Sequence, residues 1–217
     1  MKINTPTKIT LVRIVSVFVL LVYLGIMGML SVANQLSPLD TLGNTHITIP
    51  GLVAAVVFVI GSATDWLDGY LARKNNQVTN LGKFLDPIAD KMLVNSMMIF
   101  FCVTWTGIND FVQVPVFCVI VMVIRDLIVD TLRFAASKKG VVLAANMFGK
   151  LKTTFQMVAL PFIMLGDFPF SYFTEGWDPI VRLYCAPSVI MIYIATAMSI
   201  ISGVIYVVQN RSVLKED

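Results

Sequence analysis

The sequence predicts an all-α integral membrane protein that forms one domain over residues 1–217, with six transmembrane helices and both termini in the cytoplasm. Three observations lead to this prediction. Hydrophobic residues make up 57% of the chain and charged residues only 13%, whereas an average soluble domain has about 25% charged residues. The apolar residues gather in long uncharged runs, and the basic residues gather at one side of those runs.

The uncharged runs give the helices in chain order. Those at residues 14–39, 41–64, 92–109 and 183–210 reach the roughly 17 to 25 residues that a spanning helix needs. Two shorter runs, at 111–124 and 153–166, reach that length when a charged turn is added at one end. The runs argue against a transmembrane barrel, because its strands would alternate apolar and polar residues, whereas these runs are apolar on every face.

The charges predict the orientation of the chain. Fifteen of the 16 Lys and Arg residues lie in the two terminal segments or in the second-to-third and fourth-to-fifth helix connections. The remaining connections, at 34–48, 107–112 and 166–182, hold Arg182 as their one basic residue. Basic residues favour the cytoplasmic side, so both termini are expected there. His46 is the chain's one histidine and falls in a predicted loop, which argues against histidine-based catalysis.

Four carboxylates are expected to meet at this cytoplasmic side. Asp65 and Asp68 are three residues apart at the end of the second helix, and Asp86 and Asp90 are four apart at the start of the third. Each pair occupies one helix face, so two antiparallel helices could present all four acids to one another. Oxygen ligands without histidine or cysteine suit Mg²⁺ or Mn²⁺, and two such ions would form a clamp for phosphoryl transfer.

Neighbouring residues are compatible with a phosphate ligand. Gly69 and Gly82 remove side-chain bulk where a nucleotide or pyrophosphate could approach, and Arg73 could pair with a phosphate oxygen. Two other interpretations of the acids stay open. They could share protons in a buried network that only orients helices, or they could bind Na⁺ or H⁺ in a cation-coupled transporter.

The pattern D-x2-D-G-x2-A-R-x8-G-x3-D-x3-D, complete from residue 65 to residue 90, resembles the signature of the CDP-alcohol phosphatidyltransferase family. The resemblance implies six transmembrane helices, a homodimer, a dinuclear metal site, and group transfer from a CDP-linked donor with release of CMP. It implies that Asp65, Asp68, Asp86 and Asp90 bind the metals and that Asp90 is also the general base. It places Asp68, Gly69, Ala72, Arg73 and Gly82 at the CDP-diacylglycerol site.

Two further stretches resemble the branch of this family whose acceptor is sn-glycerol 3-phosphate. Thr10 and Arg13 match its N-terminal motif, and Thr10 is therefore added to the predicted CDP-diacylglycerol site. Residues 125–133 resemble its common form R-E-x-x-V-T-G-L-R, with Asp126 as a mild departure and Asp130-Thr131 as a larger one.

Four cations are expected to hold the acceptor phosphate: Arg125, Arg133, Lys150 and Lys152. Guanidinium groups would grip the phosphate in a bidentate way, while the lysines act as point charges. Alternatively, Asp126 and Asp130 pair with the two arginines as structural salt bridges, or the basic residues attract anionic lipid headgroups.

The expected protein is thus a phosphatidyltransferase of a bacterial cytoplasmic membrane, with its active site facing the cytoplasm. It would transfer the phosphatidyl group of CDP-diacylglycerol to sn-glycerol 3-phosphate, using two divalent cations, Mg²⁺ or Mn²⁺. Membrane lipid and a second copy of the chain are its expected partners, and no nucleic acid is expected. Inositol phosphate, serine or a lipid remains open as another acceptor.

Overall fold

The computed structural model confirms the predicted all-helical class. It describes residues 5–32, 46–74, 80–102, 111–140, 143 and 146–211, and within these ranges it leaves out the side chains of residues 5–7, 31, 32, 65–74, 80–84, 86, 87 and 138. No β-strand occurs in these described ranges. The helices are α1 Thr5–Val32, α2 Ile49–Lys74, α3 Asn80–Phe100, α4 Val116–Lys138, α5 Met147–Met164, α6 Ser171–Thr174, α7 Pro179–Cys185 and α8 Pro187–Gln209.

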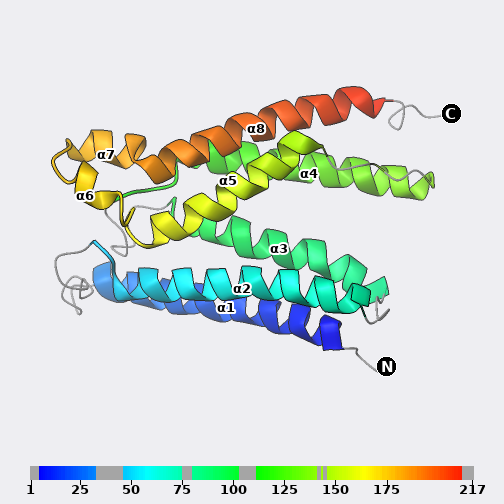
Figure 1. Cartoon of the computed structure of the whole chain (residues 1–217), viewed down its shortest axis with the longest axis horizontal. Helices are drawn as coiled ribbons and strands as arrows, with labels where there is room; N and C mark the ends of the chain where they lie inside the picture. The colour runs from blue at the N-terminus through cyan, green and yellow to red at the C-terminus, as the bar shows by residue number, and fades with distance from the viewer. Residues whose placement is uncertain are drawn as a thin grey trace.

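The long helices run roughly antiparallel along the bundle (Figure 1). One end of the bundle holds the start of α1, the end of α2, the start of α3, the end of α4, the start of α5 and the end of α8. We call it the cationic end, after the basic residues of α4 and α5. The start of α1 and the end of α8 therefore lie on one side of the bundle, as the charge pattern predicts.

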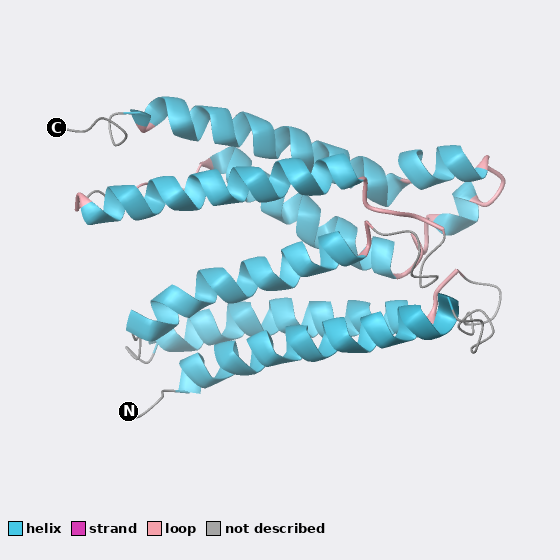
Figure 2. Ribbon diagram, turned by 180° about the vertical axis from the view of Figure 1, so that it is seen from behind, coloured by secondary structure: helices cyan, strands magenta, loops and turns pink. Residues whose placement is uncertain are grey.

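Two groups of helices make up the bundle, and Figure 2 shows them from behind. In the first group, α1 packs against both α2 and α3. In the second, α8 packs along both α4 and α5. Contacts of α3 with α4 and α5, and of α2 with α5, join the groups. The predicted base Asp90 lies on α3, and the four predicted acceptor-site cations lie on α4 and α5, the two helices of the second group that α3 contacts.

Each of the six predicted runs overlaps a different long helix, but the bounds differ. The last run, at 183–210, is divided, because its first residues belong to the short helix α7 and most of the rest to α8. The helices α2, α3 and α4 extend beyond the uncharged runs into charged residues at the cationic end. A helix can continue there because its backbone hydrogen bonds do not depend on side-chain charge. The predicted connection at 166–182 contains the short helix α6 and the start of α7, where the Asp178 side chain accepts a hydrogen bond from the Ile180 amide at 2.9 Å and caps α7.

Two of the described helices are both long enough and apolar enough to cross a membrane. They are Lys8–Leu30 and Pro187–Gln209, with 23 residues each, and Ile49–Thr64 is a shorter apolar helix. The packing is consistent with an apolar surrounding. Val12 is 68% exposed and Phe117 is 67% exposed, whereas the charged Lys152 is 3% exposed. Broad outward apolar faces of this kind mark surfaces that contact lipid or other protein.

The end of the bundle opposite the cationic end is closed by an aromatic stack. The His46 ring lies 3.9 Å from the Phe111 ring centroid, and the Arg182 guanidinium lies 3.9 Å from the same ring. Burial, and after it the positive charge of Arg182, lowers the pKa of His46. Gly166, with φ of 64°, ends α5 against His46, where a Cβ atom would meet the His46 carbonyl oxygen at 2.5 Å. His46 therefore has a packing role far from the cationic end.

Candidate functional site

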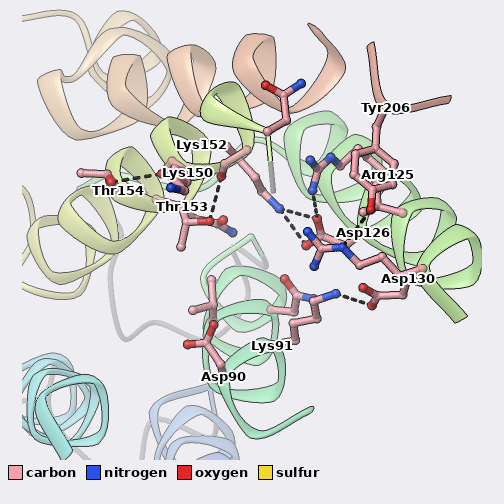
Figure 3. Close-up of a pocket in the computed structure, with 17 residues that line it drawn as sticks. Asp90, Lys91, Arg125, Asp126, Asp130, Lys150, Lys152, Thr153, Thr154 and Tyr206 are labelled. Atoms are coloured by element: carbon pink, nitrogen blue, oxygen red, sulfur yellow. Dashed lines mark hydrogen bonds and ion pairs between the residues drawn. The ribbon is translucent and has the colours of Figure 1, made fainter. Parts of the chain in front are cut away.

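A cavity of about 490 Å³, lined mostly by charged and polar residues, opens between α3, α4, α5 and α8 near the cationic end (Figure 3). Its α4 wall follows the helical repeat, because residues 125, 126, 129, 130 and 133 share one helix face. The complete lining is Asp90, Lys91, Val94, Asn95, Arg125, Asp126, Val129, Asp130, Arg133, Asn146, Gly149, Lys150, Lys152, Thr153, Thr154, Gln156 and Tyr206.

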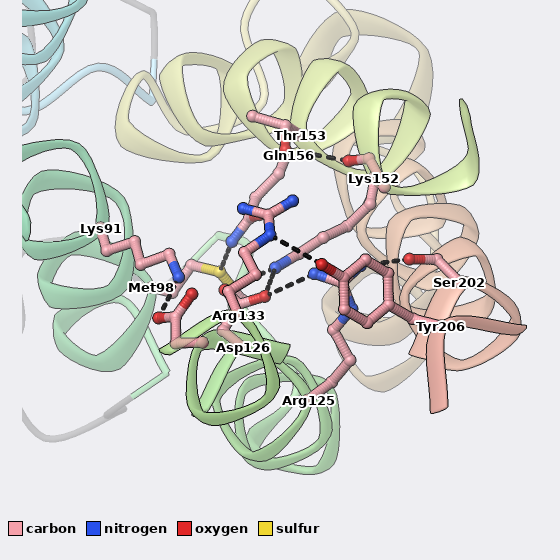
Figure 4. A network of polar contacts seen from close by, with 12 residues as sticks. Lys91, Met98, Arg125, Asp126, Arg133, Lys152, Thr153, Gln156, Ser202 and Tyr206 are labelled. Atoms are coloured by element: carbon pink, nitrogen blue, oxygen red, sulfur yellow. Dashed lines mark hydrogen bonds and ion pairs between the residues drawn. The ribbon is translucent and has the colours of Figure 1, made fainter. Parts of the chain in front are cut away.

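A buried ion-pair cluster forms the floor of this cavity (Figure 4). The Lys152 ammonium donates to both carboxylate oxygens of Asp126, each at 2.7 Å. Arg125 donates from Nη1 to the same carboxylate at 3.0 Å. Asp126 is 8% exposed and Lys152 is 3% exposed, so neither charge is well solvated by water. The Lys152 ammonium and the Asp126 carboxylate stabilise each other, because a buried charge without a partner raises the free energy of the folded state.

A second ion pair lies at the more open side of the cavity. The Lys91 ammonium on α3 contacts the Asp130 carboxylate on α4, and both side chains are partly exposed. The alternative prediction that Asp126 pairs with Arg125 is confirmed, but the matching prediction of an Asp130–Arg133 pair is wrong. Lys91 forms an ion pair with Asp130 because α3 packs against this face of α4. Helix periodicity within α4 alone does not reveal this tertiary contact.

The charges of the lining sum to an excess of positive charge. Five cations face three carboxylates: Lys91, Arg125, Arg133, Lys150 and Lys152 against Asp90, Asp126 and Asp130. The excess of two positive charges complements a phosphate monoester, which carries about −1.5 to −2 at neutral pH. A cavity with this balance favours a small anion over a neutral ligand.

Several predicted residues are brought together here. All four predicted acceptor-site cations, Arg125, Arg133, Lys150 and Lys152, line the cavity, together with the predicted base Asp90. They come from α3, α4 and α5, so the sequence prediction that separate basic segments share one location holds. Thr10 lies buried on α1 and is not part of this lining.

The other predicted positions lie outside the described side chains. Asp65, Asp68, Gly69, Ala72 and Arg73 belong to α2, and Gly82 and Asp86 belong to α3. Among the side chains that the structure does describe, no three His, Cys, Asp or Glu residues gather as a metal site. The backbone of α2 ends beside the start of α3 at the cationic end (Figure 1), which is the arrangement that the four-carboxylate prediction requires.

Sequence reasoning missed the contribution of α8. Tyr206 lines the cavity, and its hydroxyl accepts a hydrogen bond from Arg133 Nε at 3.1 Å. Ser202, one turn earlier, accepts a hydrogen bond from Arg125 Nη2. A signal was present in the sequence, since Ser188, Thr196, Ser199, Ser202 and Tyr206 are polar residues that recur at helical spacing in an otherwise apolar helix.

The fold and the cavity together describe a membrane-associated helical bundle whose cavity complements a small anion, and comparison with known proteins identifies its class. The chain belongs to the CDP-alcohol phosphatidyltransferase family, whose sequence model matches residues 3–201. The resemblance predicted from residues 65–90 is thereby confirmed, and the protein is a transferase that uses a CDP-linked donor.

The individual relatives are more specific. The chain is 34% identical over 216 residues to the CDP-diacylglycerol–glycerol-3-phosphate 3-phosphatidyltransferase of Bacillus subtilis, covering 98% of this chain and 97% of the relative. It is 34% identical over 214 residues to the protein of that name in Mycoplasma pneumoniae, covering 97% and 88%. The Escherichia coli K12 protein of the same name is 36% identical over 168 residues, covering 76% and 78%.

Proposed function

We propose that the protein transfers the phosphatidyl group of CDP-diacylglycerol to sn-glycerol 3-phosphate, giving phosphatidylglycerophosphate and CMP. The names of the relatives, which align over most of the chain, support this assignment. The structural observation that carries it is the cavity, which combines the carboxylate Asp90 with an excess of positive charge. A phosphorylated alcohol needs both features, because its phosphate requires cations and its hydroxyl requires a base.

In the proposed reaction, the 1-hydroxyl oxygen of glycerol 3-phosphate attacks the β-phosphorus of the donor, which carries the diacylglycerol. Asp90 accepts the hydroxyl proton as the new phosphorus–oxygen bond forms. The bond from this phosphorus to the bridging oxygen breaks, and that oxygen leaves as part of CMP. Arg125, Arg133 and Lys150 hold the acceptor phosphate, and this positioning brings the hydroxyl to Asp90.

The donor set proposed for the metals consists of carboxylates alone, from Asp65, Asp68, Asp86 and Asp90. This chemistry fits Mg²⁺ or Mn²⁺, which prefer oxygen ligands. Bound cations would neutralise the donor's pyrophosphate. The proposed CDP-diacylglycerol contacts are Asp68, Gly69, Ala72, Arg73, Gly82 and Thr10.

We further propose that the six long helices all span the bacterial inner membrane, with the cationic end in the cytoplasm and the enzyme working as a homodimer. The distribution of basic residues supports this orientation. Cysteine accessibility tests it in a variant lacking Cys102, Cys118 and Cys185. A cysteine at Lys139 should react with an impermeant thiol reagent from the cytoplasmic side, and one at Glu175 from the other side. Labelling of both positions from one side would contradict the six-span arrangement.

The activity itself is tested with an acceptor panel. The purified full-length enzyme receives labelled CDP-diacylglycerol, Mg²⁺, and one acceptor at a time from glycerol 3-phosphate, inositol phosphate, serine and a phospholipid. We expect product and CMP with glycerol 3-phosphate. Asp90→Asn serves as the negative control. Its rate should be about 10²- to 10⁴-fold lower than that of the wild type, as is typical when a general base is removed. Transfer to another acceptor alone would reject the assignment.

A further inference from the structure

The last helix, α8, places two hydroxyl groups against the two arginines of the cavity. Ser202 and Tyr206 are four residues apart and therefore lie on one face of α8, toward α4. Ser202 contacts Arg125, and Tyr206 contacts Arg133 (Figure 4). Ser202 is fully buried and Tyr206 is 2% exposed, so both hydroxyls are fixed by the surrounding packing.

The Arg125 side chain runs through a narrow slot between two glycines. A Cβ atom at Gly203 of α8 would lie 3.0 Å from Arg125 Cγ, and one at Gly149 of α5 would lie 3.1 Å from Arg125 Nη2. Most real Cβ contacts are longer than these distances, so a side chain at either position would require Arg125 to shift by a few tenths of an ångström. Both terminal nitrogens of Arg125 are engaged, one by Asp126 and the other by Ser202. Arg125 is thus held in one orientation.

Arg133 is held differently, and the difference assigns it a role. Tyr206 engages its Nε, and the guanidinium carbon lies 5.6 Å from the centroid of the tyrosine ring, within cation–π range. Among the described residues, neither terminal nitrogen of Arg133 has a hydrogen-bond acceptor. These two nitrogens form the edge of the planar fork that matches two phosphate oxygens. Tyr206 therefore engages the Nε–H and leaves the N–H groups of both terminal nitrogens for this grip.

We infer that Tyr206 and Ser202 are positioning residues for the acceptor: Tyr206 presents Arg133 to the acceptor phosphate as the main grip, and Ser202 fixes Arg125 beside it. This inference rests on the proposed function, since the ligand is the phosphate of glycerol 3-phosphate. It goes further by dividing the roles of the two arginines and by bringing α8 into acceptor specificity. A bidentate grip depends on orientation, so loss of either hydroxyl weakens acceptor binding while the charges remain.

The test measures KM for each substrate separately in the full-length enzyme with Mg²⁺. Tyr206→Phe keeps the ring and removes one oxygen, and Ser202→Ala removes the other hydroxyl. Each should raise the KM for glycerol 3-phosphate about 2- to 12-fold, as expected for one net hydrogen bond, with little change in the KM for CDP-diacylglycerol. Tyr193→Phe and Ser199→Ala are the matched controls on α8, since neither residue lines the cavity, and both should leave the acceptor KM unchanged.

A double-mutant cycle separates positioning from a general packing role. In an Arg133→Lys background the Nε–H is gone, so Tyr206→Phe should add almost nothing to the acceptor KM. In the same background Ser202→Ala should keep its full effect, because it acts through Arg125. Equal increases in KM for both substrates, or a Tyr206→Phe effect that persists beside Lys at position 133, would overturn the inference.

A third variant covers the case in which a hydroxyl variant does not fold. Gly203→Ala keeps every hydroxyl and charge but crowds Arg125 Cγ, and it should also raise the acceptor KM alone. If the folded Gly203→Ala enzyme has an unchanged KM for glycerol 3-phosphate, the space beside Gly203 does not control the orientation of Arg125, and the inference is contradicted. The two proposals fail in different ways. A wild-type enzyme that does not use glycerol 3-phosphate refutes the proposed function, whereas an active wild type with unaffected α8 variants refutes only the positioning inference.

Discussion

Replacement of Asp126 by Asn should destabilise the protein strongly, although the two side chains have nearly the same shape. Asp126 accepts two hydrogen bonds from Lys152, both at 2.7 Å, and one from Arg125 at 3.0 Å. The substitution removes the negative charge and leaves the buried ammonium of Lys152 uncompensated. Breaking a buried ion pair on one side costs about 3 to 5 kcal/mol. For a chain of this length that corresponds to a fall in Tm of roughly 6 to 20 °C.

The matched control lies one turn further along α4. Asp130→Asn makes the same chemical change in the Lys91 pair, whose carboxylate side chain is 45% exposed, and pairs of this kind contribute about 0 to 1 kcal/mol. Thermal unfolding in detergent, followed by tryptophan fluorescence, measures both variants. A further change, Asp126→Asn with Lys152→Met, should recover part of the lost stability because it removes the stranded ammonium. Equal Tm values for Asp126→Asn and Asp130→Asn would refute the reasoning.

Three further predictions concern the cavity and its surroundings. Lys150→Gln should raise the KM for glycerol 3-phosphate without lowering Tm, since Lys150 is exposed and makes no ion pair with a described residue, whereas Lys152→Gln should mainly lower Tm. Asp130→Asn should lower the acceptor KM, most clearly at low salt, because it frees the Lys91 ammonium; a higher KM would contradict this electrostatic role. His46→Gln should keep kcat and both KM values near those of the wild type, since His46 comes just before α2, whose start lies at the end of the bundle opposite the cavity. Steady-state kinetics of each purified variant check all three.

Much of the fold could be predicted because it depends on local patterns. Six long apolar segments and the alternation of basic connections require an antiparallel helical bundle with its charges at one end. The first and last residues of the helices were less predictable from the sequence. α3 begins at Asn80, a dozen residues before its uncharged run, because the segment with Lys83, Asp86 and Lys91 is helical despite its charges.

The candidate site could be predicted in part. Arg125, Arg133, Lys150 and Lys152 could be predicted because each lies in a charged segment beside an uncharged run, although α4 continues past its run and Arg125 therefore lies in the middle of that helix. The partners of these cations depend on how α3, α5 and α8 pack against α4, and no spacing within one helix encodes that. Lys91 and Tyr206 were missed for this reason. The packing also separates two lysines that the sequence grouped together, since Lys152 is paired and buried while Lys150 is exposed.

The most direct test of the central claim is the effect of Arg133→Ala on the two Michaelis constants. If the cavity holds the acceptor phosphate, the variant loses charge-assisted hydrogen bonds worth roughly 1.5 to 3 kcal/mol. The KM for glycerol 3-phosphate should then rise about 10- to 150-fold, while the KM for CDP-diacylglycerol stays nearly constant. An unchanged acceptor KM in a well-folded Arg133→Ala enzyme would contradict the assignment of this cavity as the acceptor site.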